Sequence, residues 1–152
     1  MSGRKRHLLV DTQGFVLKAV VSAADVQDRD GARLVAQAVR WFGPELPRLT
    51  LVWADAAYGG TLPDELRATL GWTVEIVARP DDQPKTAFRV QPHRWIVERT
   101  FAWFGGCRRL SKEYEYQLES SEAMIYAGMT HLLLRRLARL VTCTPAPSSP
   151  AG

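Results

Sequence analysis

A chain of 152 residues with 46% hydrophobic content is long enough for one globular domain with a buried core, and this composition excludes disordered and fibrous proteins. The formal net charge is +4, and Cys107 and Cys143 follow no zinc-site or disulfide-framework spacing, so a reducing, cytoplasmic setting is the default expectation. No apolar run approaches the roughly 18 residues of a membrane helix, and Leu8–Val10 is too short for a secretion signal.

The first part of the chain is predicted to form a β-hairpin. Two apolar, β-branched runs within Leu8–Val21 flank the polar stretch Asp11–Gly14. Asp11 is then a turn residue whose side chain accepts hydrogen bonds from nearby backbone N–H groups, and turn chemistry favours this role over a catalytic one. An amphipathic helix over residues 32–42 follows, and the aspartates at 25, 28 and 30 are predicted to be capping and loop residues before it.

The middle of the chain is predicted to alternate strand, helix and strand, over residues 49–55, 62–70 and 72–78. This order favours an α/β fold in which a mixed sheet carries crossover helices. Asp55 stands at the carboxyl end of its strand, the edge at which open α/β sheets bind ligands. The structural alternative for this acid is the N-cap of a short helix.

A second acid, Glu98, lies in the helix-like run Gln91–Leu110, in which Pro92 suits a first turn and Gly105–Gly106 suits a stop. Glu98 is the only acid of that run. An ion pair with Arg94 would explain it and would contribute only about 0.2–0.5 kcal/mol. Alternatively, Glu98 and Asp55 together would bind Mg²⁺ or Mn²⁺ for phosphoryl transfer.

Basic residues are concentrated in one part of the chain. Between Arg79 and Lys112 there are eight Lys or Arg residues and three acids, a local excess of five positive charges. Together with the basic triplet Arg4–Arg6, this predicts a polyanionic partner such as DNA, although a solubilising basic surface is the alternative.

The remaining segments complete the predicted domain, which spans residues 1–141. Residues 79–90 are predicted to form a loop and residues 124–141 a last helix. Residues 142–152 are predicted to form a disordered tail.

Residues 3–14, 22–32, 54–58 and 94–110 together resemble the C-terminal catalytic region of bacterial insertion-sequence DDE transposases. The resemblance implies a ribonuclease-H-like mixed sheet flanked by helices, with two aspartates and one glutamate binding two Mg²⁺ (or Mn²⁺) ions. Asp55 matches the second aspartate and Glu98 the glutamate, so both are expected as catalytic residues and metal ligands. The DNA contacts are expected from basic residues around Glu98, namely Arg94, Arg99, Arg108, Arg109 and Lys112.

The family's first aspartate lies on a first strand upstream of the hairpin, and Asp11 falls on the hairpin turn instead. The chain is therefore expected to be a transposase fragment without the first strand, from a truncated copy or a second reading frame, with an exposed sheet edge. We expect DNA strand cleavage and strand transfer during transposition, with poor activity in this chain alone because its active site is incomplete. The alternative is an inactive DNA-binding remnant.

The partners implied are DNA, as element ends and target, together with a second copy of the chain and an upstream reading-frame product, and no membrane. An unrelated small α/β enzyme is not favoured, since neither a glycine-rich phosphate loop nor a GxSxG motif is present.

Overall fold

The computed structural model describes residues 3–42, 46–77 and 93–142. Its elements in chain order are β1 (Arg4–Val10), β2 (Val16–Ala23), α1 (Asp28–Phe42), β3 (Leu51–Asp55), the 3₁₀ helix η1 (Ala56–Tyr58), α2 (Leu62–Leu70), β4 (Thr73–Val77), α3 (Arg94–Gly105) and α4 (Leu118–Thr142). The α/β class and the order of elements are as the sequence predicts. The predicted loop over 79–90 and most of the predicted tail lie outside the described residues.

The predicted hairpin is confirmed. Strands β1 and β2 pair antiparallel from Arg4 opposite Ala23 to Val10 opposite Val16, with an irregularity between Leu9 and Val10. One oxygen of Asp11 accepts hydrogen bonds from the backbone N–H groups of Gln13 and Phe15, both at 2.8 Å. Asp11 is therefore the turn residue that the sequence predicts.

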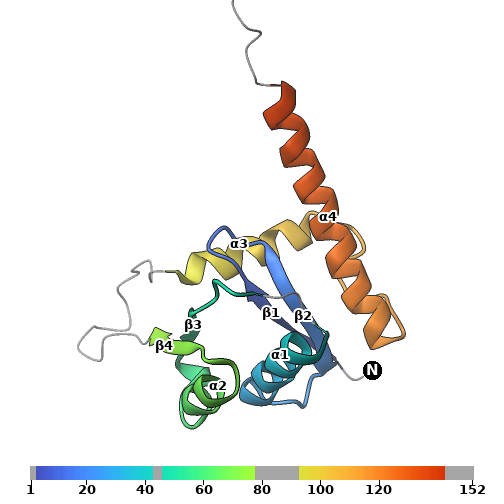
Figure 1. Cartoon of the computed structure of the whole chain (residues 1–152). Coiled ribbons are helices and arrows are strands. Elements are labelled where there is room, and N and C mark those ends of the chain that lie inside the picture. The colour runs from blue at the N-terminus through green and yellow to red at the C-terminus, as the bar shows by residue number, and fades with distance from the viewer. Residues whose placement is uncertain (1–2, 43–45, 78–92, 143–152) are drawn as a thin grey trace, which may run out of the picture.

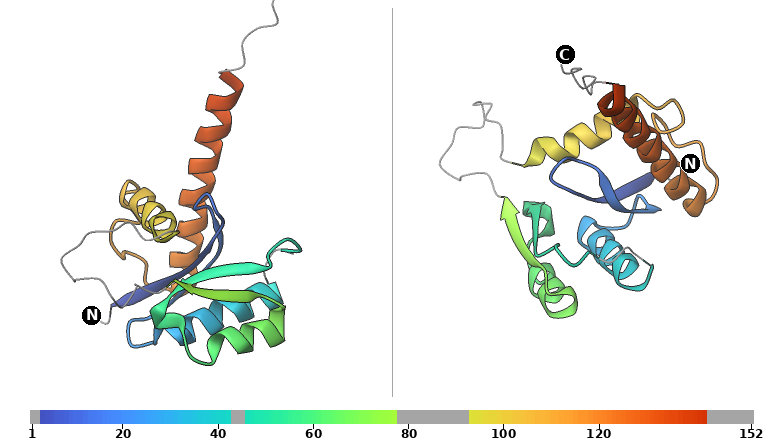
Figure 2. Two further views of the ribbon diagram at one scale, coloured as in Figure 1. Left: turned by 90° about the vertical axis from the view of Figure 1, so that its left-hand side faces the viewer. Right: turned by 45° about the horizontal axis from the view of Figure 1, so that its top comes forward.

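Helix α1 covers one face of the hairpin, and α3 lies on the other side (Figures 1 and 2). The helix begins at Asp28, four residues before the predicted start, so Asp28 and Asp30 lie in its first turn, where the helix dipole favours acids. Leu9 of β1 packs with Val35 and Val39 of α1 in one buried cluster.

His7 is buried between β1 and α1. Its Nε2 lies 2.8 Å from the hydroxyl oxygen of Ser22, and its ring lies where a β-carbon of Gly31 would be. Burial lowers the pKa of His7 and outweighs the opposite effect of Asp28, so the imidazole is held neutral.

Strands β3 and β4 pair parallel, from Leu51 opposite Thr73 to Asp55 opposite Val77, and α2 is the crossover between them. Gly71 ends α2 at φ 72°, a left-handed conformation that favours glycine. Arg33 of α1 binds both carboxylate oxygens of Glu65 of α2, at 2.7 and 2.8 Å. This pairing holds the pKa of Glu65 at about 2 and ties the two helices together.

Helices α3 and α4 close the other side of the hairpin. Ile125 and Met129 of α4 and Phe104 of α3 pack on Ala19 and Val21 of β2 in the second buried cluster. The carboxyl-terminal part of α4 projects beyond the rest of the fold (Figure 1) and exposes several leucines, such as Leu134 and Leu140. Within the described ranges, no helix has the length and apolarity needed to cross a membrane.

The strands differ from the single mixed sheet expected. In the part of the chain that the structure describes, they form two separate two-stranded sheets, β1–β2 and β3–β4. The outer edge of β2 is covered by α4, because Ala19 and Val21 donate their backbone N–H groups to the Tyr126 hydroxyl and the Glu122 carboxylate, each at 2.9 Å. No described strand lies between β1 and β3, so the sheet that the pattern predicts is divided at that point.

Candidate functional site

Asp55 ends β3 and is exposed on the wall of a groove between the two sheets. One of its carboxylate oxygens accepts a hydrogen bond from the backbone N–H of Ala57 at 2.9 Å, which caps η1. The alternative role for Asp55, as the N-cap of a short helix, is therefore observed. A carboxylate offers about four acceptor positions on its two oxygens, so one capping bond leaves capacity for a cation.

Glu98 is exposed on α3 and lines the same groove, 43 positions along the chain from Asp55. The two acids identified from sequence are thus both placed on one concave surface. The Arg94 side chain, the other partner in the predicted ion pair, lies outside the described residues.

A stacked pair of rings links the two elements that carry these acids. The ring of Trp53 lies parallel to that of His93, with 3.9 Å between ring centroids. Trp53 precedes Asp55 by two positions on β3, hence on the same face of the strand, and His93 immediately precedes α3. The indole N–H is oriented by Glu75 of β4 at 2.9 Å. Sequence reasoning missed this ring stack, because the spacing of Trp53 and His93 in the sequence does not indicate that the two residues are in contact.

The hairpin turn fixes α3 from its other side. Thr100 is fully buried and its hydroxyl donates to the Gly14 carbonyl oxygen at 2.6 Å. Arg99 donates to the Gln13 carbonyl oxygen, and its guanidinium carbon lies 4.5 Å from the ring centroid of Trp95 and 5.1 Å from that of Trp103. The orientation of the helix that carries Glu98 therefore depends on the turn organised by Asp11.

Thr100→Val is expected to lower the free energy of unfolding by about 1–3 kcal/mol, because an isosteric methyl group leaves the buried Gly14 carbonyl without its donor. Urea denaturation would measure the loss. Thr130→Val, at an exposed position of α4, is the matched control and should change stability little. Equal stability of the two variants would show that the Thr100 hydroxyl does not hold the turn.

Tyr58 lies beside Asp55 on the groove wall and is a further residue that sequence reasoning left without a role. Burial raises the pKa of its phenol, and the negative charges of Asp28 and Asp55 act in the same direction. The hydroxyl is therefore held protonated and able to donate a hydrogen bond. In the sequence, only its position three residues after Asp55 indicates that Tyr58 belongs to the site.

The carboxylates of the groove do not form a complete metal cluster. Asp11, Asp55 and Glu98 all line it, yet nowhere in residues 3–42, 46–77 and 93–142 do three His, Cys, Asp or Glu side chains gather as metal ligands. Mg²⁺ is commonly held by one or two carboxylates with substrate phosphates and water completing the shell. Asp55 and Glu98 fit that donor set as oxygen ligands. Asp11 accepts both turn N–H bonds on one oxygen, so its other oxygen is a further acceptor on the same groove.

The predicted DNA-binding residues differ in their surroundings. Arg108 and Lys112 are exposed, and Lys112 also lines the groove. Arg109 is exposed but pairs with Glu115 at 2.7 Å, which raises its pKa. Arg99 is packed against two tryptophans as described above.

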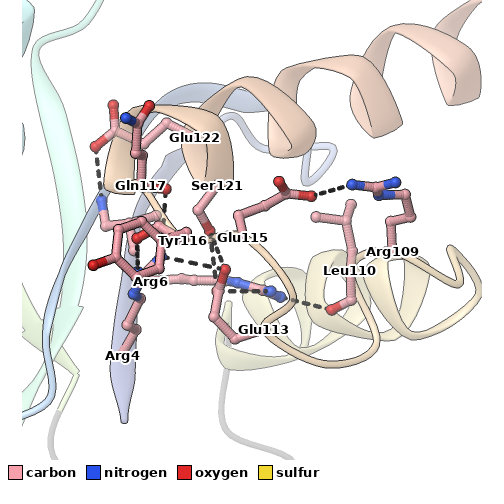
Figure 3. A network of polar contacts seen from close by, with 11 residues as sticks. Arg4, Arg6, Arg109, Leu110, Glu113, Glu115, Tyr116, Gln117, Ser121 and Glu122 are labelled. Carbon is pink, nitrogen blue, oxygen red and sulfur yellow. Dashed lines mark hydrogen bonds and ion pairs between the residues drawn. The ribbon is translucent and has the colours of Figure 1, made fainter. Parts of the chain in front are cut away.

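The amino-terminal basic triplet, which the sequence suggests as part of a polyanion-binding surface, makes contacts within the chain. Arg6 donates to the Leu110 carbonyl at 2.7 Å, and both Arg4 and Arg6 pair with Glu113, at 3.6 and 3.3 Å (Figure 3). Lys5 pairs with Asp28 at 3.2 Å. These bonds fasten β1 to the segment after α3 and to α1, a role that charge counting cannot distinguish from DNA binding.

Comparison with known proteins gives one family. Residues 1–133 match the family model described as Transposase DDE domain. The chain is also 26% identical over 141 residues to a protein from Burkholderia cepacia described as a putative transposase for insertion sequence element IS402. That match covers 90% of this chain and 65% of the relative, so the chain spans slightly less than two thirds of its relative's length. No solved structure matches.

Proposed function

This chain belongs to the family of transposase DDE domains, and from that premise we propose that it contributes to DNA strand cleavage and strand transfer by metal-dependent phosphoryl transfer. Asp55 and Glu98 are the proposed catalytic residues and metal ligands in a ribonuclease-H-like arrangement. DNA, as element ends and target, is the proposed partner, and the cytoplasm is the proposed location.

One observation carries the proposal. Asp55 and Glu98 are distant in sequence, yet both line one groove, and the Trp53–His93 stack connects the elements on which they lie. If Glu98 served only in an ion pair on the surface of α3, it would not need to line the same groove as Asp55. Two carboxylates on one groove, with Lys112 also on its lining, suit metal-dependent phosphoryl transfer.

Each residue then has a distinct task. Asp55 would offer the oxygen lone pairs that its capping bond leaves, from the rigid end of β3, and Glu98 would offer oxygens from α3. Tyr58, held protonated, is placed to donate a hydrogen bond near Asp55. Arg108 and Lys112 would bind DNA phosphates at the exposed rim, with Arg94, Arg99 and Arg109 as the other proposed contacts. A bound Mg²⁺ or Mn²⁺ would supply charge stabilisation for the attacking and leaving oxygens.

The second candidate function is a DNA-binding remnant without catalytic activity. It is favoured by the capping bond of Asp55 and by the lack of a three-residue metal cluster in the described part of the chain. Under this alternative Asp55 serves only η1, and the exposed basic residues alone carry function.

Mn²⁺ binding, followed by electron paramagnetic resonance, separates the two candidates. Asp55→Asn and Glu98→Gln should each weaken binding by at least about tenfold, or roughly 1.4 kcal/mol, because each removes one anionic ligand. Asparagine preserves the capping acceptor, so Asp55→Asn keeps η1 intact. Asp64→Asn, at an exposed acid of α2, is the control and should bind Mn²⁺ like the unaltered chain.

Two further measurements, of DNA binding and of plasmid nicking, complete this experiment. Salt-sensitive DNA binding should be retained by all four proteins, with slow or undetectable nicking of supercoiled plasmid by this chain alone. If Mn²⁺ binds equally to all four proteins, neither acid is a metal ligand and the DNA-binding remnant is the better description.

A further inference from the structure

His93, the residue immediately before α3, departs from local backbone preference in two ways. Its φ is 69°, a left-handed conformation that is uncommon outside glycine, and no other non-glycine residue in the described ranges has a positive φ. His93 also occupies the N-cap position of α3, where a side chain commonly accepts a hydrogen bond from the helix backbone, yet its side chain makes no such bond. Both departures are locally unfavourable, so a tertiary contact compensates for them.

The compensating contact is the stack with Trp53. The two rings are parallel, with 1° between their planes and 3.9 Å between their centroids. The indole is itself fixed, because its N–H donates to a Glu75 carboxylate oxygen at 2.9 Å, and Glu75 lies opposite Trp53 in the pairing of β3 with β4. The imidazole therefore packs on a surface that belongs to the sheet, and the stack attaches the amino terminus of α3 to β3.

The stack lies close to both proposed metal ligands along their elements. Asp55 follows Trp53 by two positions, which is roughly 7 Å along a strand, and it lies on the same face. Glu98 follows His93 by five positions, which is roughly 7.5 Å along a helix. Both rings and both acids line one groove. A change in how the rings pack is therefore transmitted over a short path to the separation of the two carboxylates.

The core contacts of α3 described above hold its later turns. The Thr100 hydroxyl bonds the hairpin turn, and Phe104 packs in the cluster on β2. In the first turn Ile96 is buried, whereas Trp95 is 46% and Val97 37% exposed. The amino-terminal end of α3 is thus less deeply packed than the rest of the helix, and the ring stack secures that end.

We propose that Trp53 and His93 are a pair of positioning residues, whose stacked rings hold the first turn of α3 against β3 and so fix the separation of Asp55 and Glu98. The assignment rests on the proposed function in one respect, because the two acids are taken as metal ligands. The ordering of α3 by the stack does not depend on that function. Neither ring binds the metal ion, and both act through the position of Glu98.

Two variants each remove one ring and leave both acids in place. His93→Asn removes the imidazole but keeps a residue type that tolerates the left-handed conformation, and Trp53→Leu keeps an apolar side chain on β3. Hydrogen exchange of backbone amides in the first two turns of α3 should be at least about threefold faster in each variant, as expected for loss of an aromatic pair. Trp41→Leu, at a 70% exposed tryptophan of α1, is the matched control and should leave this exchange unchanged.

The double variant Trp53→Leu/His93→Asn shows whether the two rings act together. Once one ring is removed the other has no partner, so the double variant should exchange about as fast as the faster single variant and not about ninefold faster than the unaltered chain. Mn²⁺ affinity should follow the same pattern, with about threefold weaker binding in each single variant and no further loss in the double. A metal-binding His93 would instead make His93→Asn weaken binding equally with and without Trp53, which would contradict the proposal.

Three other results would also overturn it. These are unchanged exchange in α3 after loss of either ring, equal acceleration by Trp41→Leu, and Mn²⁺ binding that neither ring affects. If Trp53→Leu does not fold, exchange in His93→Asn decides alone, because His93 is only partly buried and precedes the helix. The exchange measurement contains neither metal nor DNA. If exchange responds as expected but the unaltered chain binds no Mn²⁺, the rings still order α3 and the proposed phosphoryl transfer is what fails.

Discussion

Replacing Ile125 with alanine is expected to lower the free energy of unfolding by about 2–5 kcal/mol, because truncation of a fully buried side chain loses transfer free energy and leaves a cavity. Ile125 packs where three elements meet, with Val21 of the hairpin, Phe104 of α3 and Met129 of its own helix. Neighbours held on separate elements cannot all move inward to fill the space. For a domain of this size, each kcal/mol corresponds to about 2–4 °C in Tm.

Thermal unfolding followed by circular dichroism would measure this loss. Leu137→Ala is the matched control on the same helix, because Leu137 is 57% exposed and its truncation creates no cavity. The control should unfold close to the temperature of the unaltered chain. A drop as large as that of Ile125→Ala would mean that the projecting part of α4 is buried in solution, for example in an oligomer.

Gly31→Ala is expected to destabilise the chain by about 1–3 kcal/mol, although alanine normally strengthens a helix by about 1 kcal/mol over glycine. A β-carbon at this position would lie 2.1 Å from atoms of the His7 ring. That ring is buried and close to the Ser22 hydroxyl, so it can yield only by breaking that contact or by separating α1 from β1.

Two comparisons make the test specific. Gly105→Ala is the control, since a β-carbon there meets nothing within 4 Å and the residue ends α3, so this variant should be as stable as the unaltered chain or more stable. Adding His7→Ala to Gly31→Ala should recover part of the loss by removing the clash. A urea midpoint for Gly31→Ala equal to that of the Gly105→Ala control would contradict the close packing of α1 on the hairpin.

The two acids of the candidate site were identified from local patterns. An acid after a short apolar strand and a lone acid on an arginine-flanked helix can each be recognised without coordinates. Local patterns do not show which distant residues support them. The Trp53–His93 stack and the Thr100 bond to Gly14 join segments 40 and 86 positions apart, and no periodicity encodes such contacts.

Of the sequence features used, charge predicted the roles of individual residues least well. The count of basic residues treated the amino-terminal arginines and those near Glu98 alike, because a sequence shows the sign of a charge and not its partner. In the structure Arg4 and Arg6 are engaged by Glu113, and Arg99 by two tryptophans and a turn carbonyl, whereas Arg108 and Lys112 are exposed. Arg109 is also exposed but is paired with Glu115, so exposure alone does not identify the arginines that can bind phosphates without giving up an internal contact.

The sequence by itself determined the elements and their order, since the hairpin turn at Asp11, the stop at Gly105–Gly106 and the strand ending at Asp55 depend on backbone chemistry within a few residues. Only the tertiary structure decided how the strands are joined. Pairing between strands depends on which edges meet, and β1 and β3 meet across a groove with no described strand between them. The division of the sheet therefore follows from packing and not from local preference.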